Sequence, residues 1–302
     1  MKKGIAKFLN ESEKKDFLKK EDAAFSKRVD VALSGLISDP ELRVILLSGP
    51  SGSGKTTASE RIAAKFAAVG RHIQFVSVDD FYLDRDEIAR RAEKEKRKVE
   101  YESAKALDLE ALARFAEDVK ERKQTSVPRF SFAEGKKVGE KLIDCSAGEV
   151  VLIEGIQALY PEIKALFADI KHIELFIRPL GELQVANALF DGNELRLFRR
   201  IVRNSLHRGS SADFEFDMWR TVRDNEEENI FPSVSEGVNV IDSMLAYGPN
   251  VIKPMLMRSL EAVEKKSPYY EYARDIIRRF DGIEEIDREL LPIDSLFCEF
   301  VF

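Results

Sequence analysis

The sequence predicts an α/β fold in which a mainly parallel β-sheet lies between two layers of helices. Three observations support this prediction: short apolar runs typical of buried strands, helical-period segments that alternate with them, and a glycine cluster between one apolar run and the next helix. Runs that are apolar throughout suit strands covered on both faces, as in a parallel sheet. The expected strands are residues 43–48, 73–78, 150–153, 172–177 and 238–241.

Apolar residues at helical spacing predict the helices around these strands. The run of charge at residues 84–98 fits either a solvated helix or a loop, and the apolar residues 296–302 fit either a docked segment or a subunit contact. Because the sequence has no internal repeat and no low-complexity linker, we expect one elaborated domain. Its expected parts are a helical segment at 1–42 and the main domain at 43–302, with an arginine-rich helical lid at about 196–230 and a helical extension at about 251–302.

Composition narrows the class of protein. Of 302 residues, 44% are hydrophobic and 34% are charged, which excludes a disordered chain and a membrane protein. The net charge of −6 excludes a whole-molecule electrostatic grip on nucleic acid. Cys145 and Cys298 lie too far apart for a zinc motif and form no disulfide framework. We expect a cytoplasmic protein without nucleic-acid or membrane partners, and a homo-oligomer is left open.

The glycine cluster matches a phosphate-binding pattern. Gly49 to Thr56 reads G-x-x-x-x-G-K-[ST] between an expected strand and an expected helix, which predicts a P-loop NTPase fold with three layers, α/β/α. Glycines let successive backbone N–H groups point at phosphate oxygens, and the helix adds its N-terminal partial positive charge. Lys55 is expected to reach the β- and γ-phosphates, and Thr56 to bind Mg²⁺. The predicted ATP-binding residues are Gly49, Ser51, Gly52, Ser53, Gly54, Lys55, Thr56 and Thr57.

Two carboxylates stand at the ends of expected strands. Asp79 follows the second strand, where it can accept the proton of an attacking hydroxyl or help hold the metal. Its alternative role is to cap the next segment. Glu154 ends the run Val150 to Ile153, and it is placed to hold Mg²⁺ directly or through water.

Arginines are concentrated in the expected lid. Those at positions 196, 199, 200 and 203 recur at spacings of three and four, so much of this charge shares one helical face. Such a face is either solvated or, in a lid, it stabilises charge on a transferred phosphoryl group.

Taken together, these segments resemble the uridine kinase and phosphoribulokinase family of P-loop kinases, and in particular its uridine kinase-like bacterial branch. That branch often carries an N-terminal TGS region, which this sequence does not contain. The matching segments are GPSGSGKTT (49–57), SVDDFY (77–82), YESAKALDL (101–109), VPRFSF (127–132), VVLIEGI (150–156) and LFRRIVRNSLHRG (197–209).

The resemblance implies a role for each matched position. The residue matching Asp79 is the base, the residue matching Glu154 helps hold Mg²⁺, and an aspartate at the position of Glu102 binds ribose hydroxyls. The family's base-contacting tyrosine and histidine align with Phe130 and Gly135, so Phe130 can stack on a base but the hydrogen bonds that select a pyrimidine are lost. The lid arginines that the resemblance places on phosphate and substrate are Arg200, Arg203 and Arg208.

We therefore expect an ATP- and Mg²⁺-dependent kinase that phosphorylates a hydroxyl of a small metabolite, such as uridine or cytidine. Its catalytic residues are predicted as Lys55, Asp79, Arg203 and Arg208, and its substrate contacts as Asp79, Glu102, Phe130 and Arg200. Another polyol or sugar is an alternative acceptor. A nucleotide-binding regulator and a plain ATPase are alternatives of a different class, and neither needs Asp79 as a base for an acceptor.

Overall fold

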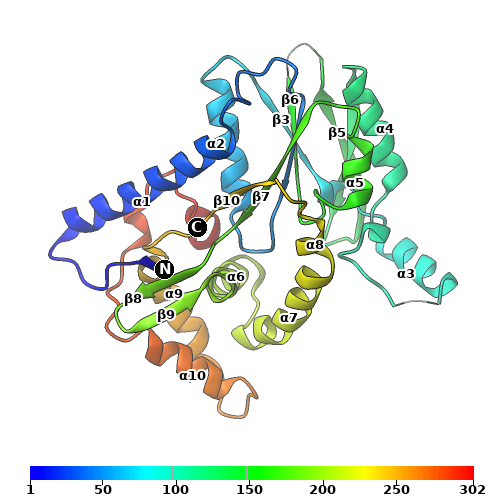
Figure 1. Cartoon of the computed structure of the whole chain (residues 1–302). Helices are drawn as coiled ribbons and strands as arrows, with labels where there is room; N and C mark the ends of the chain where they lie inside the picture. Colours follow the sequence, from blue (N-terminus) through cyan, green and yellow to red (C-terminus); the bar gives the residue numbers. More distant parts are fainter. Residues whose placement is uncertain (97, 147–148) are drawn as a thin grey trace.

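The computed structural model describes residues 1–96, 98–146 and 149–302, and a five-stranded sheet lies at its centre (Figure 1). The strand order is β10-β7-β2-β6-β3, and all neighbouring strands are parallel. Every expected strand is confirmed to within about two residues at each end. The strands are β2 (Val44–Ser48), β3 (Ile73–Ser77), β6 (Val150–Glu154), β7 (His172–Arg178) and β10 (Asn239–Asp242).

Alternate residues of the buried strands face opposite layers. Ile45 and Leu47 of β2 pack in one apolar cluster, which also holds α1 (Glu11–Ala32) and α2 (Lys55–Ala67). Val44 and Leu46 pack in a second cluster with α4 (Leu109–Lys120) and α5 (Pro161–Leu166). Because the side-chain period of a strand is two, a sheet that is apolar on both faces must be covered on both. Figure 1 shows α1 and α2 on one side of the sheet and α4 and α5 on the other.

The remaining helices lie in the charged run, in the arginine-rich region and in the chain after β10. The charged run is helical in its first part, and residue 97 of that run lies outside the described residues. The arginine-rich region is divided at Gly209, which has a φ of +64° and ends its first helix. None of the described helices has both the length and the apolarity of a membrane span. The other helices are α3 (Arg85–Lys94), α6 (Gly192–Arg208), α7 (Ala212–Asn225), a π-helical turn (Glu226–Ile230), α8 (Phe231–Ser233), α9 (Gly248–Glu261), α10 (Tyr270–Arg279) and α11 (Cys298–Val301), with 3-10 turns at Val78–Phe81, Ala104–Ala106 and Arg288–Leu290.

Two antiparallel hairpins were not expected. Strands β4 (Gln124–Ser131) and β5 (Lys136–Asp144) form one, and β8 (Glu182–Val185) and β9 (Ala188–Asp191) form the other, with β1 (Lys2–Lys3) paired to β8. Most residues of β4 and β5 are exposed or half-buried, so these strands carry no continuous apolar run in the sequence.

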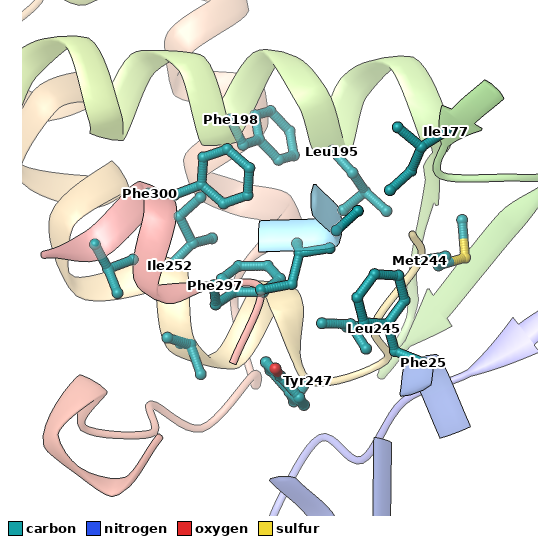
Figure 2. Packing of buried hydrophobic residues seen from close by; sticks show 14 of the residues in the cluster. Phe25, Ile177, Leu195, Phe198, Met244, Leu245, Tyr247, Ile252, Phe297 and Phe300 are labelled. Carbon is teal, nitrogen blue, oxygen red and sulfur yellow. The ribbon is translucent and has the colours of Figure 1, made fainter. Parts of the chain in front are cut away.

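The apolar C-terminal residues dock inside the protein. Leu296, Phe297, Phe300 and Val301 are buried in the same cluster as α1 and α2. Figure 2 shows Phe297 and Phe300 among side chains of α6 and α9, including Phe198 and Ile252. Of the two roles that the sequence left open for residues 296–302, the structure contains the docked segment.

Candidate active site

The loop between β2 and α2 has a backbone that only glycine permits at critical points. Gly54, the residue before α2, has a φ of +94°, in the left-handed region that side chains rarely adopt. A Cβ atom on Gly49 would lie 2.3 Å from the carbonyl oxygen of Ile177. The two glycines of the sequence motif therefore let the chain curl tightly from the end of a core strand into the first turn of a helix.

This loop has free capacity for an anion. Within residues 1–96, 98–146 and 149–302, no protein acceptor reaches the backbone N–H groups of Gly54, Lys55 and Thr56. The Oγ atom of Ser53 is buried and also lacks a partner there. The Lys55 ammonium group donates to the Gly49 carbonyl at 2.8 Å. Burial lowers the pKa of Lys55, and the carboxylates of Glu154, Glu299 and Asp79 oppose that shift. Such donors suit a polyphosphate.

The two strand-end carboxylates meet because β3 and β6 are neighbours. Ser77 pairs with Glu154 in the sheet register, and its Oγ donates to Glu154 Oε1 at 3.4 Å. The same Oγ accepts a hydrogen bond from the backbone N–H of Asp79 at 3.3 Å. Burial, and then the charge of Glu154, raises the pKa of Asp79 to about 6, whereas Lys55 lowers it. Asp79 is therefore a carboxylate with raised basicity beside the phosphate loop.

The predicted metal ligands line one cavity. Thr56 and Glu154, together with Ser77 and Lys141, border a cavity of about 250 Å³. No cluster of three or more His, Cys, Asp or Glu side chains suited to a metal occurs in the described part of the chain. Magnesium bound with a nucleotide takes much of its coordination from phosphate oxygens and water, so one hydroxyl and one carboxylate from the protein fit that ion.

Four arginines of α6 reach the loop, and two of them contact the side chain of Ser51. Arg200 donates to Ser51 Oγ at 2.7 Å and to Glu215 at 3.1 Å. Arg203 lies 3.5 Å from the same Ser51 oxygen, and burial, followed by the nearby charge of Arg208, lowers its pKa. Arg208 is exposed, and its charge also acts on Asp79. The three predicted lid arginines thus gather around the loop and the carboxylate.

Arg196 and Arg199 have a different task. Both are almost fully buried. Arg196 donates to the Ser51 carbonyl at 3.0 Å and to both carboxylate oxygens of Glu226 at 2.6 Å. Arg199 donates to the carbonyls of Gly52 at 3.2 Å and Ser243 at 3.0 Å. The alternative of a solvated arginine face is therefore wrong for Arg196 and Arg199, because both are buried and donate to backbone carbonyls of the loop. Sequence spacing placed them on the helix, but only the structure shows that they are buried and donate to backbone carbonyls of the loop.

A second cavity, of about 370 Å³, lies beside the β4–β5 hairpin. Its walls include the rings of Tyr82, Phe130 and Phe132, with centroids 5.3 to 5.6 Å apart. Two predicted substrate contacts, Glu102 and Phe130, line it. Burial raises the pKa of Glu102, which the charge of Arg200 opposes. Asp79 and Arg200 do not line this cavity, although the charge of each acts on Glu102 at its wall.

The sequence did not identify Arg85 as a pocket residue. Gly135 lies in the hairpin turn, and a Cβ atom there would come within 2.5 Å of Arg85 Cδ. The backbone N–H of Arg85 donates to the Gly135 carbonyl at 2.8 Å, and its side chain lines the cavity. Arg85, the first residue of α3, therefore fills the space beside Gly135 that a side chain at that position would need. In the sequence, the glycine at position 135 was the one indication that another side chain occupies this space.

Comparison with known proteins decides the family. The sequence profile of the Phosphoribulokinase / Uridine kinase family matches residues 44–246. The chain belongs to this family. A uridine kinase of Ureaplasma parvum serovar 3 is 29% identical over 192 residues, which are 63% of this chain and 83% of the relative. A uridine kinase of Saccharomyces cerevisiae is 27% identical over 204 residues, which are 67% of this chain and 37% of the relative.

One solved structure, of a Silicibacter sp. TM1040 protein provisionally named a fructose transport system kinase, is 21% identical and has a TM-score of 0.49. The alignment covers 72% of this chain and 97% of that chain. Family membership and the parallel sheet agree with the expected P-loop fold. The protein is thus a P-loop kinase for a small-molecule acceptor.

Proposed function

We propose that this P-loop kinase transfers the γ-phosphate of ATP, with Mg²⁺, to a hydroxyl group of a small ring-bearing polyol, and that a nucleoside such as uridine or cytidine is the first acceptor to test. One observation carries the proposal: Asp79 interacts with both halves of the site. Its pKa responds to Glu154 and Lys55 at the phosphate loop. Its charge in turn raises the pKa values of Tyr82 and Glu102 in the neighbouring cavity, after burial as the main cause.

The reaction follows from this placement. The loop N–H groups and Lys55 would bind the triphosphate, and Thr56 and Glu154 would hold Mg²⁺. The metal would supply positive charge to the phosphate oxygens. Asp79 accepts the proton of the acceptor hydroxyl while the hydroxyl oxygen forms a bond to the γ-phosphorus. The bond from that phosphorus to the bridging oxygen breaks, and ADP leaves. Arg200, Arg203 and Arg208 stabilise the charge on the transferred group.

The second cavity supports a ring-bearing acceptor. Aromatic walls from Tyr82, Phe130 and Phe132 suit a flat or apolar ring face. Glu102 can accept hydrogen bonds from hydroxyl groups. The tyrosine and histidine that would read a pyrimidine are replaced, and Arg85 offers donors to a carbonyl or anionic group instead. We therefore expect weaker selection for pyrimidines than for the hydroxyl pattern. A cytoplasmic location would suit such a metabolite kinase.

An acceptor screen tests the proposal. Purified protein is incubated with MgATP and a panel of nucleosides, sugars and other polyols, and acceptor-dependent ADP release is measured with mass-spectrometric detection of the phosphorylated product. A product from a nucleoside supports the full proposal, and a product from a sugar or linear polyol corrects its acceptor. Normal ATP binding without any phosphorylated product would overturn it. Phosphate release that needs no acceptor would identify a plain ATPase.

A further inference from the structure

The C-terminal segment, residues 294–302, lies directly against the phosphate loop. A Cβ atom on Gly54 would lie 2.6 Å from a methyl carbon of Leu296. The guanidinium of Arg199, which holds the loop backbone, lies 5.0 and 5.3 Å from the ring centroids of Phe297 and Phe300 (Figure 2 shows these rings). The segment is therefore in contact with the loop and with the arginine that supports it.

Glu299 uses a donor that belongs to the anion site. Its Oε2 atom accepts from the backbone N–H of Thr57 at 3.3 Å and from Thr57 Oγ1 at 3.4 Å. Thr57 is the third residue of α2, and the first intrahelical bond runs from Ala58 to Gly54. The Thr57 N–H is thus among the free donors at a helix start that attract anions.

The charges around Glu299 are those expected to bind a polyphosphate. Burial raises the pKa of Glu299, and Lys55, the Thr57 N–H and Arg203 lower it. Glu154, a further carboxylate near the loop, raises it again. A carboxylate held by these groups stands in the place of one anionic oxygen of a ligand and repels the others.

The segment is fastened on both sides of Glu299. After Glu299, Phe300 and Val301 are buried, and Arg288 donates to the Val301 carbonyl at 2.6 Å. Tyr247 Oη lies 2.9 Å from Asp22 Oδ2 and 2.7 Å from Ser295 Oγ. Arg61 donates to the Asp294 carbonyl at 2.7 Å. These contacts join residues 294 and 295 to α1 and α2, whereas Glu299 lies on the single turn α11. Glu299 thus lies between two fixed points, so freeing Thr57 requires a local opening of the turn α11.

We propose that residues 294–302 form an autoinhibitory contact, in which the Glu299 carboxylate occupies the Thr57 donors and competes with the nucleotide phosphates. This inference rests on the proposed function only in taking ATP as the ligand. MgATP binding requires Glu299 to leave Thr57 and loosens the turn Cys298–Val301. The sequence held one signal for it: Glu299 is the only charged residue in the run Leu296–Phe302.

Charge-removing variants test the competition. The dissociation constant of MgATP is measured by calorimetry for the full-length wild type, for Glu299→Gln and for Glu299→Ala. We expect about tenfold tighter binding in both variants, because a like charge is removed from the anion site. Glu264→Gln is the matched control, since its exposed carboxylate pairs at 2.8 Å with the exposed Lys266 in the turn after α9. The control should bind MgATP as the wild type does. Unchanged or weaker binding in Glu299→Gln would overturn the inference.

A measurement on the wild type keeps the inference testable if the variants fold poorly. Hydrogen–deuterium exchange of residues 298–301 is compared with and without MgATP. The inference expects faster exchange when MgATP is bound, and unchanged or slower exchange at saturation would contradict it. If MgATP binds neither the wild type nor Glu299→Gln, the proposed function fails together with the inference. If both bind it equally well, only the inference fails.

Discussion

The two halves of the site are built in different ways. The donor half consists of the phosphate loop, two strand-end carboxylates and arginines of α6, and it is covered by residues 294–302. The acceptor half is a cavity of about 370 Å³ at a hairpin outside the central sheet, with the exposed side chain of Arg85 at its edge. The donor half is made largely of backbone groups and buried charges, which bind a phosphate common to many reactions. The acceptor half is made of side chains that can change without disturbing the sheet. Chemistry and specificity therefore lie in separable parts of the chain.

The largest effect on catalysis is expected at Asp79, where the two halves of the site meet. Asp79→Asn removes the base but keeps a side chain of the same size, so kcat should fall by about 10²- to 10⁴-fold. The dissociation constant of MgATP should change little, because the loop donors remain. Steady-state kinetics and calorimetry measure the two quantities. A variant with near-normal kcat would show that Asp79 is not the base.

The donor half should also carry much of the stability. Arg196→Met removes the bidentate partner of Glu226, which is fully buried, and leaves Arg223 as its remaining cationic partner. Because Arg223 still compensates the charge of Glu226, we expect the free energy of unfolding in urea to fall by about 2 to 3 kcal/mol. Arg220→Met is the control, since Arg220 is exposed and 4.0 Å from Asp224, and its effect should stay below about 0.5 kcal/mol. Equal effects from the two variants would refute the assigned role of Arg196.

The free energy of unfolding should depend on pH through Asp22, which helps to fasten the C-terminal segment. Burial raises the pKa of Asp22 to about 6, although Tyr247 and Arg61 oppose the shift. The folded state therefore favours the protonated form, and stability from this group is lost as the pH rises from about 4 to about 6. Relative to the wild type, Asp22→Asn should gain about 2 to 3 kcal/mol of unfolding free energy over that range. Urea titrations at several pH values measure the difference. A difference that does not vary with pH would contradict the prediction.

The smallest effect is expected in the acceptor half. Glu102→Gln keeps the shape of the pocket but weakens hydrogen bonds to acceptor hydroxyls, so KM for the acceptor should rise about tenfold. The dissociation constant of MgATP should remain as in the wild type. Glu100→Gln, nearby on an exposed stretch, serves as the control. If Glu102→Gln weakened ATP binding instead, the division of the site into two halves would be wrong.

The sequence was informative wherever the fold buries its residues. Apolar runs predicted the strands of the central sheet, and the loop motif with its flanking strand and helix predicted the donor half. Asp79 and Glu154 were predicted to lie in one crevice because strand ends meet at one edge of a parallel sheet. That their strands are direct neighbours is shown by the structure. The β4–β5 hairpin could not be predicted in this way, because its exposed, largely polar residues leave no periodic signal.

The sequence by itself therefore determined the class of fold, the phosphate loop and the carboxylates at the strand ends, since each depends on local spacing along the chain. Only the tertiary structure decided which arginines of α6 donate to the loop backbone and which contact Ser51 Oγ, because this depends on how deeply each side chain is buried. It also decided that Arg85 fills the space beside Gly135 and that Glu299 meets Thr57. These contacts join residues far apart in the chain, so no spacing within the sequence records them.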